Sequence, residues 1–249
     1  MKRISSLLLM AIAILFSNIS DAQTFSLGVR SGLSIPNLTA GGSEKNPLNT
    51  GYKSRLGPDE AIFGEYHISS LFSLEAMLEY SSQGGKKTGM QAFTNPQGDQ
   101  PPYLYANFKS EARLNYLLVP VLAKFGWNLS NHSPIRIYFD AGPFAGFLLS
   151  AHQVTSGSSM VYADPQGTQP VSPSAQPFDA NNDIKDQLNT FNFGVSGNLG
   201  FAYHFAKSNV FIEGGGNYGF LNIQKGTANG KNNTGAGTVA LGYAYTFGK

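Results

Sequence analysis

Apolar and polar residues alternate along most of the chain, in eight stretches separated by polar connections. The clearest stretch covers residues 72–81, where apolar side chains occupy every second position and Glu75 and Glu79 stand between them. A repeat of two residues places successive side chains on opposite faces of an extended strand. The alternation therefore predicts eight strands, at residues 24–33, 61–68, 72–81, 109–125, 135–150, 190–205, 210–221 and 236–247.

The connections between these strands alternate in length. Four are long and polar, and three are short turns. An even number of antiparallel strands joined in this way is typical of bacterial outer-membrane barrels, whose external loops are long and whose periplasmic turns are short. The pattern predicts an all-β fold, an eight-stranded antiparallel up-and-down transmembrane β-barrel, with external loops at 35–60, 84–107, 151–188 and 222–235 and periplasmic turns at 69–70, 127–134 and 207–209.

The two faces of the strands differ in what they tolerate. Glu75 and Glu79 share one face of their strand. Two carboxylates cannot face lipid, so that face is predicted to line the lumen. Eight strands leave an interior that side chains just fill. A soluble periplasmic sandwich is the alternative fold, and it would leave the outward aromatic residues of 190–205 and 236–247 in need of a partner sheet.

The first residues have the features of an export signal. Two basic residues follow Met1, an apolar run covers 7–16, and small residues lead to Ala22. This order is typical of a secretory signal peptide, and the run is shorter than the roughly 20 residues that span a bilayer. We expect a signal peptide at 1–22 and one barrel domain at 23–249, located in the bacterial outer membrane.

Composition narrows the classes of partner. The chain has no cysteine, so it forms no disulfide and carries no lipid-modified cysteine. After removal of the signal peptide, 15 basic and 14 acidic residues remain, and Lys and Arg do not cluster. Nucleic acid is therefore not expected as a partner, whereas outer-membrane lipid is. No metal-ligand spacing such as His-Glu-x-x-His occurs, and no cofactor is implied.

Four segments carry a family resemblance. Residues 28–34 read Gly-Val-Arg-Ser-Gly-Leu-Ser, and 78–86 read Leu-Glu-Tyr-Ser-Ser-Gln-Gly-Gly-Lys. Residues 116–124 read Tyr-Leu-Leu-Val-Pro-Val-Leu-Ala-Lys, and 141–143 read Ala-Gly-Pro. In this order they resemble strand motifs of the PorT-like outer-membrane β-barrel family. Leu118 stands where that family commonly has Glu, so one lumenal charge of the family pattern is missing.

The resemblance covers nearly all of the chain after the signal peptide and implies the same barrel fold. It also implies, for some members, a place in a secretion machine or another envelope assembly. The expected function is a non-enzymatic structural or interaction scaffold, monomeric in the membrane, that presents four loops to such partners. The alternative is a narrow, porin-like channel for ions or small solutes.

Charged residues fall on the predicted lumenal face of several strands. Buried charges have to be paired, so these residues are predicted to form an ionic network that fills the lumen. In the channel alternative the same residues line a gate or a narrow ion path. A slip of one residue in register would move any of them to the opposite face. The set comprises Arg30, Glu65, Glu75, Glu79, Lys124, Arg136, Asp140 and Glu213.

Two further groups of side chains bear on function. A lipid-modifying enzyme would need a histidine beside a serine hydroxyl and a carboxylate. His204 and Ser196 share the lumenal face but lie toward the predicted periplasmic end, so an enzyme is the least favoured function. Tyrosines in or beside the loops are candidates for partner contacts or, equally, for the aromatic rim of the membrane. These are Tyr52, Tyr103, Tyr105 and Tyr162.

Overall fold

A computed structural model of the protein describes residues 24–40, 46–98, 100–130, 132–226 and 230–248. The predicted signal peptide at 1–22 lies outside these residues. Within the described part, no helix is long and apolar enough to cross a lipid bilayer. Nearly all of the regular structure is β-strand, joined by one short 3-10 helix.

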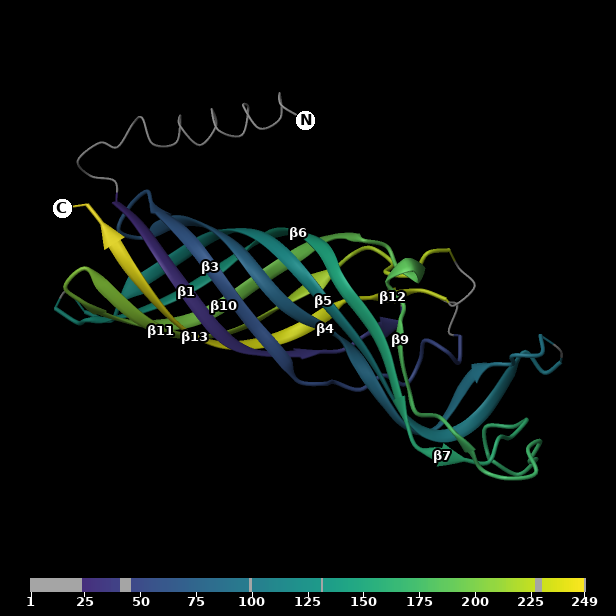
Figure 1. Cartoon of the computed structure of the whole chain (residues 1–249). Helices are drawn as coiled ribbons and strands as arrows, with labels where there is room; N and C mark the ends of the chain where they lie inside the picture. The colour runs from purple at the N-terminus through teal and green to yellow at the C-terminus, as the bar shows by residue number, and fades with distance from the viewer. Residues whose placement is uncertain (1–23, 41–45, 99, 131, 227–229, 249) are drawn as a thin grey trace.

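Eight long antiparallel strands form a closed ring (Figure 1). Each pairs with the next along the chain, and the last pairs back with the first. The predicted eight-stranded up-and-down barrel is confirmed. The strands are β1 (Thr24–Pro36), β3 (Gly57–His67), β4 (Phe72–Thr94), β5 (Tyr103–Asn128), β6 (Ile135–Ser156), β10 (Phe191–Phe205), β11 (Ser208–Gly219) and β13 (Gly235–Phe247).

The ring closes through β1 and β13. Their register is continuous, from Phe25 opposite Phe247 to Pro36 opposite Ala236. Backbone N–H and C=O groups that face lipid have no water to bond to, so each strand needs a neighbour on both sides. Closure supplies that second neighbour to the first and last strands.

The outer wall of the barrel is apolar. Leu27 and Val29 on β1 point outward and are about half exposed, whereas the next residue, Arg30, points inward and is 4% exposed. Aromatic rings also stack on this wall, where Phe139 lies 5.8 Å from Trp127 between ring centroids. Outward apolar residues on every barrel strand make a surface suited to lipid.

The two ends of the barrel differ. The connections at residues 68–71, 129–134 and 206–207 are short and lie at the end where β1 begins and β13 finishes (Figure 1). We call this the short-turn end. The other four connections leave from the opposite end, which we call the long-loop end.

Three strands continue past the barrel wall at the long-loop end, and Figure 1 shows them bending away from it. We call residues 84–94, 103–114 and 151–156 the β4–β6 extension. The predicted loop at 84–107 is therefore mostly strand, since β4 runs to Thr94 and β5 starts at Tyr103. Most outward positions here are charged or polar, among them Lys86, Lys109 and Arg113, and Met90 is an apolar exception. This part therefore lies beyond the lipid-facing band, and it lacks the alternation that marks a membrane strand.

Short elements order the other long connections. A two-residue pair joins the first and last loops, a second pair lies within the loop after β6, and one further strand adds to the edge of β6. The elements are β2 (Thr39–Ala40), β7 (Ser158–Ser159), β8 (Gln176–Pro177), β9 (Ala180–Asp183), the helix η1 (Lys185–Gln187) and β12 (Asn232–Asn233).

Gly84 marks the point where β4 leaves the barrel, just past the last β3–β4 pair. Its φ is +116°, and a Cβ built there would lie 2.0 Å from the carbonyl oxygen of Ala112. We expect Gly84→Ala to lower the free energy of unfolding by about 1–3 kcal/mol, because an L residue is strained in this conformation. Urea unfolding in detergent micelles measures this change in the free energy of unfolding. Gly237→Ala is the control, since its Cβ meets nothing closer than 3.9 Å; equal losses in both variants would contradict the expectation.

Candidate functional site

Arg30 joins four strands inside the barrel. Its Nη1 donates to Glu213 Oε1 at 2.5 Å, and its Nη2 lies 2.8 Å from Glu79 Oε2 and 3.3 Å from Asp59 Oδ1. β4 and β11 are each two strands away from β1 around the ring, on opposite sides. The Arg30 group therefore spans the lumen rather than linking neighbouring strands.

Lys124 on β5 forms a second buried group nearer the short-turn end. Its Nζ lies 2.8 Å from Glu75 Oε2 and 3.2 Å from Glu65 Oε2. The same ammonium lies 4.3 Å from the centre of the Tyr138 ring, with the Phe63 and Phe211 rings about 6 Å away. Aromatic faces attract a cation that has been removed from water, so both rings and carboxylates hold this charge.

Tyr138 connects the two groups. Its ring faces Lys124, and its hydroxyl donates to Glu213 Oε2 at 2.7 Å. Neutral donors satisfy further carboxylate oxygens, since Ser73 donates to Glu65 at 2.5 Å and Ser81 donates to Asp59 at 3.2 Å. The result is one continuous lumenal ionic network, comprising Arg30, Asp59, Glu65, Glu75, Glu79, Lys124, Tyr138 and Glu213.

The structure brings six of the eight predicted charged residues into these ion pairs. Asp140 is buried beside them, but its partner is Asn198, which donates through its backbone N–H and its side chain at 3.1 and 2.8 Å. Arg136 is only half-buried and reaches Asn128 at 3.5 Å. Among the described residues it makes no ion pair.

Sequence reasoning missed Asp59 and the linking role of Tyr138. β3 begins at Gly57 rather than near residue 61, so Asp59 belongs to a strand and not to the preceding loop. The sequence did indicate an inward position for Asp59, because this residue lies two and four positions before the inward Ala61 and Phe63. Pro58 and the polar character of the segment concealed it.

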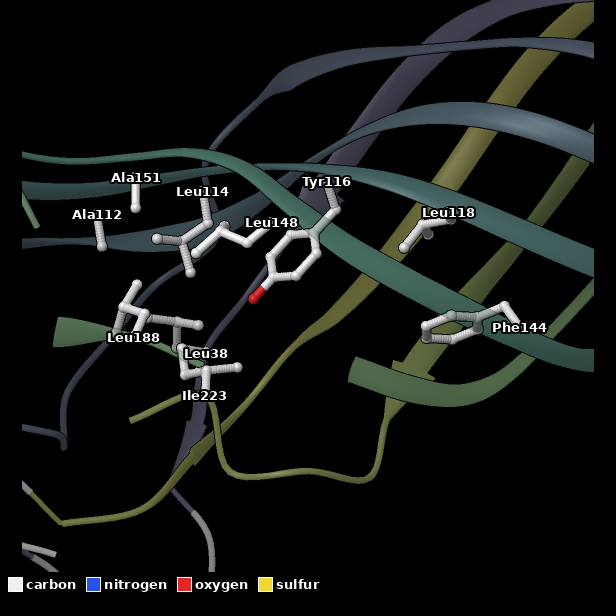
Figure 2. Packing of buried hydrophobic residues seen from close by; sticks show 10 residues of the cluster. All are labelled: Leu38, Ala112, Leu114, Tyr116, Leu118, Phe144, Leu148, Ala151, Leu188 and Ile223. Carbon is white, nitrogen blue, oxygen red and sulfur yellow. The ribbon is translucent and has the colours of Figure 1, made fainter. Parts of the chain in front are cut away.

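A cluster of apolar side chains lies in the long-loop half of the lumen. Figure 2 shows side chains from β5 and β6 meeting residues of three long connections. Tyr116 lies within this cluster, 1% exposed, and its hydroxyl has no hydrogen-bond partner among the described residues. We call the set the upper cluster: Leu38, Ala112, Leu114, Tyr116, Leu118, Phe144, Leu148, Ala151, Leu188 and Ile223.

A serine and a histidine do meet inside the barrel, at the short-turn end. The Ser26 hydroxyl lies 2.8 Å from His67 Nε2, and His67 Nδ1 lies 3.6 Å from Glu65. Ser26 is 1% exposed and also bonds Thr246 at 2.8 Å, while Glu65 is engaged by Lys124. A nucleophile needs an approachable hydroxyl, and this one is enclosed by the wall.

The four predicted loop tyrosines occupy different settings at the long-loop end. Tyr52 packs against the ammonium of Lys87, at 4.3 Å from the ring centre. The Tyr103 hydroxyl accepts a hydrogen bond from Asn46 at 3.0 Å. Tyr105 and Tyr162 exchange two backbone hydrogen bonds of 2.8 Å. None of these four side chains is among the fully buried residues.

A known family matches most of the chain, and several solved structures resemble it. A family model described as outer membrane protein beta-barrel domain matches residues 16–225. Similar solved structures include Neisserial surface protein A (14% identity, 89% of this chain and 97% of that one, TM-score 0.39) and OprG from Pseudomonas aeruginosa (11%, 93% and 100%, 0.40). Ail, the attachment invasion locus protein of Yersinia pestis, is another (11%, 89% and 98%, 0.38). Among curated proteins, no sequence matches significantly.

Removal of the Arg30 guanidinium should show how much the lumenal ionic network contributes to the free energy of unfolding. Arg30→Met leaves three buried carboxyl groups without their shared cation, so we expect the free energy of unfolding to fall by about 3–5 kcal/mol. Arg113→Met is the matched control, because that side chain is 49% exposed and Glu111 is its one ion-pair partner among the described residues; a surface pair contributes about 0–1 kcal/mol. Urea unfolding of both variants in micelles is the measurement, and similar small losses would show that the network is not stabilising.

Proposed function

The chain belongs to the outer membrane protein β-barrel domain family, and we propose that it serves there as a non-enzymatic scaffold that presents its long-loop end to partners at the cell surface. The observation that carries this proposal is the filled lumen. Ion-paired side chains cross one half of it, and the upper cluster occupies the other half. A barrel with such an interior is rigid, and its external surface is what remains for interaction.

The filled lumen argues against the narrow channel. Ion conduction needs sites that an ion can enter and leave. Here the cations of the network already hold the carboxylates at 2.5–3.3 Å across the ring, and apolar side chains follow on the long-loop side. Opening such a path would break buried ion pairs, each at a high cost in free energy.

The β4–β6 extension is the part of the surface best suited to contact. Phe108 and Phe178 stack at 4.5 Å between centroids, and Phe93 meets Phe178 edge-on at 5.6 Å. These rings fasten the loop after β6 onto the strands of β4 and β5. A partner would therefore meet a preformed surface, which lowers the entropy cost of binding.

Finer features of the proposal rest on the sequence. The PorT-like motifs support a place in a secretion or other envelope assembly, with the extension and loops as the contact surface and outer-membrane lipid around a monomeric barrel. Export through cleavage after Ala22 would leave the short-turn end in the periplasm. An enzyme is not proposed, because the enclosed Ser26 hydroxyl offers no approach to a substrate.

Conductance distinguishes the scaffold from the channel. We expect the refolded wild-type protein to insert into planar bilayers without stepwise conductance, because the lumen is filled. Protein unfolded before addition is the control for detergent artefacts. Discrete steps that change in Glu75→Ala would instead support a path through the ionic network.

Crosslinking in native outer membranes, followed by mass spectrometry, tests the contact surface. We expect a stoichiometric set of envelope proteins with the wild type and loss of that set when residues 88–109 are replaced by a short turn. Lys87 and Ser110 face each other across the strands, so the barrel below can remain folded. Shortening the loop at 163–169, whose ends are joined by a backbone hydrogen bond of 2.9 Å, is the matched control. An unchanged set in both variants would remove the extension from the proposal.

A further inference from the structure

A cavity of about 310 Å³ lies at the long-loop end. The β4–β6 extension forms one side, and described residues of three long connections form the other. These are Leu38, Leu48, Tyr52, Ile184, Gln187, Leu188, Ile223, Gln224 and Asn232. Small-molecule sites typically measure roughly 300–1,000 Å³. We call this cavity the vestibule pocket.

The floor of the vestibule pocket is apolar. Leu38, Leu114, Leu188 and Ile223 line it and also belong to the upper cluster shown in Figure 2. Phe93 adds an aromatic wall from the extension. Burying a ligand's apolar surface against such a lining is favourable by about 25 cal/mol per Å².

Lys87 places a positive charge in the wall. The residue is 7% exposed, its Nζ donates to the carbonyl oxygen of Leu48 at 2.7 Å, and the ammonium lies 4.3 Å from the centre of the Tyr52 ring. An ammonium has three N–H donors, and Leu48 accepts from one. No carboxylate of the described residues lies within 4 Å of this ammonium.

This absence sets Lys87 apart from the other buried cations of the described chain. Arg30, Arg55 and Lys124 each have a carboxylate, at 2.5, 2.9 and 2.8 Å. Burial lowers the pKa of Lys87 to about 8, as expected for a buried ammonium that has no carboxylate beside it. An anionic ligand in the pocket would supply the missing countercharge.

We propose that the vestibule pocket binds a small amphipathic carboxylate, with its headgroup on Lys87 and its apolar body on the floor of the pocket. The cavity volume lies at the lower end of the range of small-molecule sites, which suits a small ligand. A medium-chain fatty acid has this size and this division between one charge and an apolar chain. The inference does not rest on the proposed scaffold function.

Octanoate tests the proposal. The full chain, refolded into lipid nanodiscs, is titrated with sodium octanoate by calorimetry, with empty nanodiscs titrated in parallel to subtract partition into lipid. We expect saturable binding of one octanoate per barrel. Lys87→Met should weaken it about tenfold or more, because a charge-assisted hydrogen bond is lost. Lys86→Met should leave it unchanged, since Lys86 is the exposed neighbour on the opposite face of β4.

Octan-1-ol separates the headgroup from the chain. It should bind the wild type and Lys87→Met alike, whereas Leu48→Ser, which removes an apolar side chain from the wall, should weaken both ligands. Heat no greater than with empty nanodiscs, or equal losses in Lys86→Met and Lys87→Met, would overturn the proposal. If Lys87→Met does not fold, the octanoate affinity of Leu48→Ser is the deciding measurement. An unchanged affinity in that variant would also overturn the proposal. Conductance and crosslinking are read independently of octanoate, so the scaffold proposal stands or fails separately.

Discussion

Pairing of the first strand with the last is the constraint on which the rest of this molecule depends. The outer wall is apolar, so an unpaired strand edge within it would leave backbone polar groups without partners. The continuous β1–β13 register removes that edge. The same closure brings Arg30 within reach of Glu79 on one side and Glu213 on the other. The side-chain network is thus a property of the ring and of no smaller part of the sheet.

Polarity inside the ring is divided along the barrel axis. The lumenal ionic network lies nearer the short-turn end, and the upper cluster lies nearer the long-loop end. The interior is therefore closed by ion pairs in one part and by apolar contacts in the other. It also places an apolar floor beneath the loops, where Lys87 is the one buried cation of the described chain without a carboxylate.

Much of this arrangement could be predicted from the alternation of residues, because a strand between lipid and lumen constrains both of its faces. The inward position of Arg30, Glu79 and Glu213 followed from parity alone. Their mutual pairing could not follow, since it depends on how far the ring staggers each strand against strands two places away. The strands of the β4–β6 extension could not be predicted for a related reason. Outside the bilayer nothing requires outward residues to be apolar, so the sequence of these strands resembles that of a polar loop.

Arg30 also has a consequence for truncation of the chain. It belongs to the first of the eight barrel strands, whereas Glu213 belongs to the seventh. Asp59 and Glu79 lie on β3 and β4, so two carboxylate partners of Arg30 precede β11 in the chain, and only the third comes from β11. The complete set of ion pairs therefore depends on the seventh strand, and a barrel truncated before β11 would lack the Arg30–Glu213 pair.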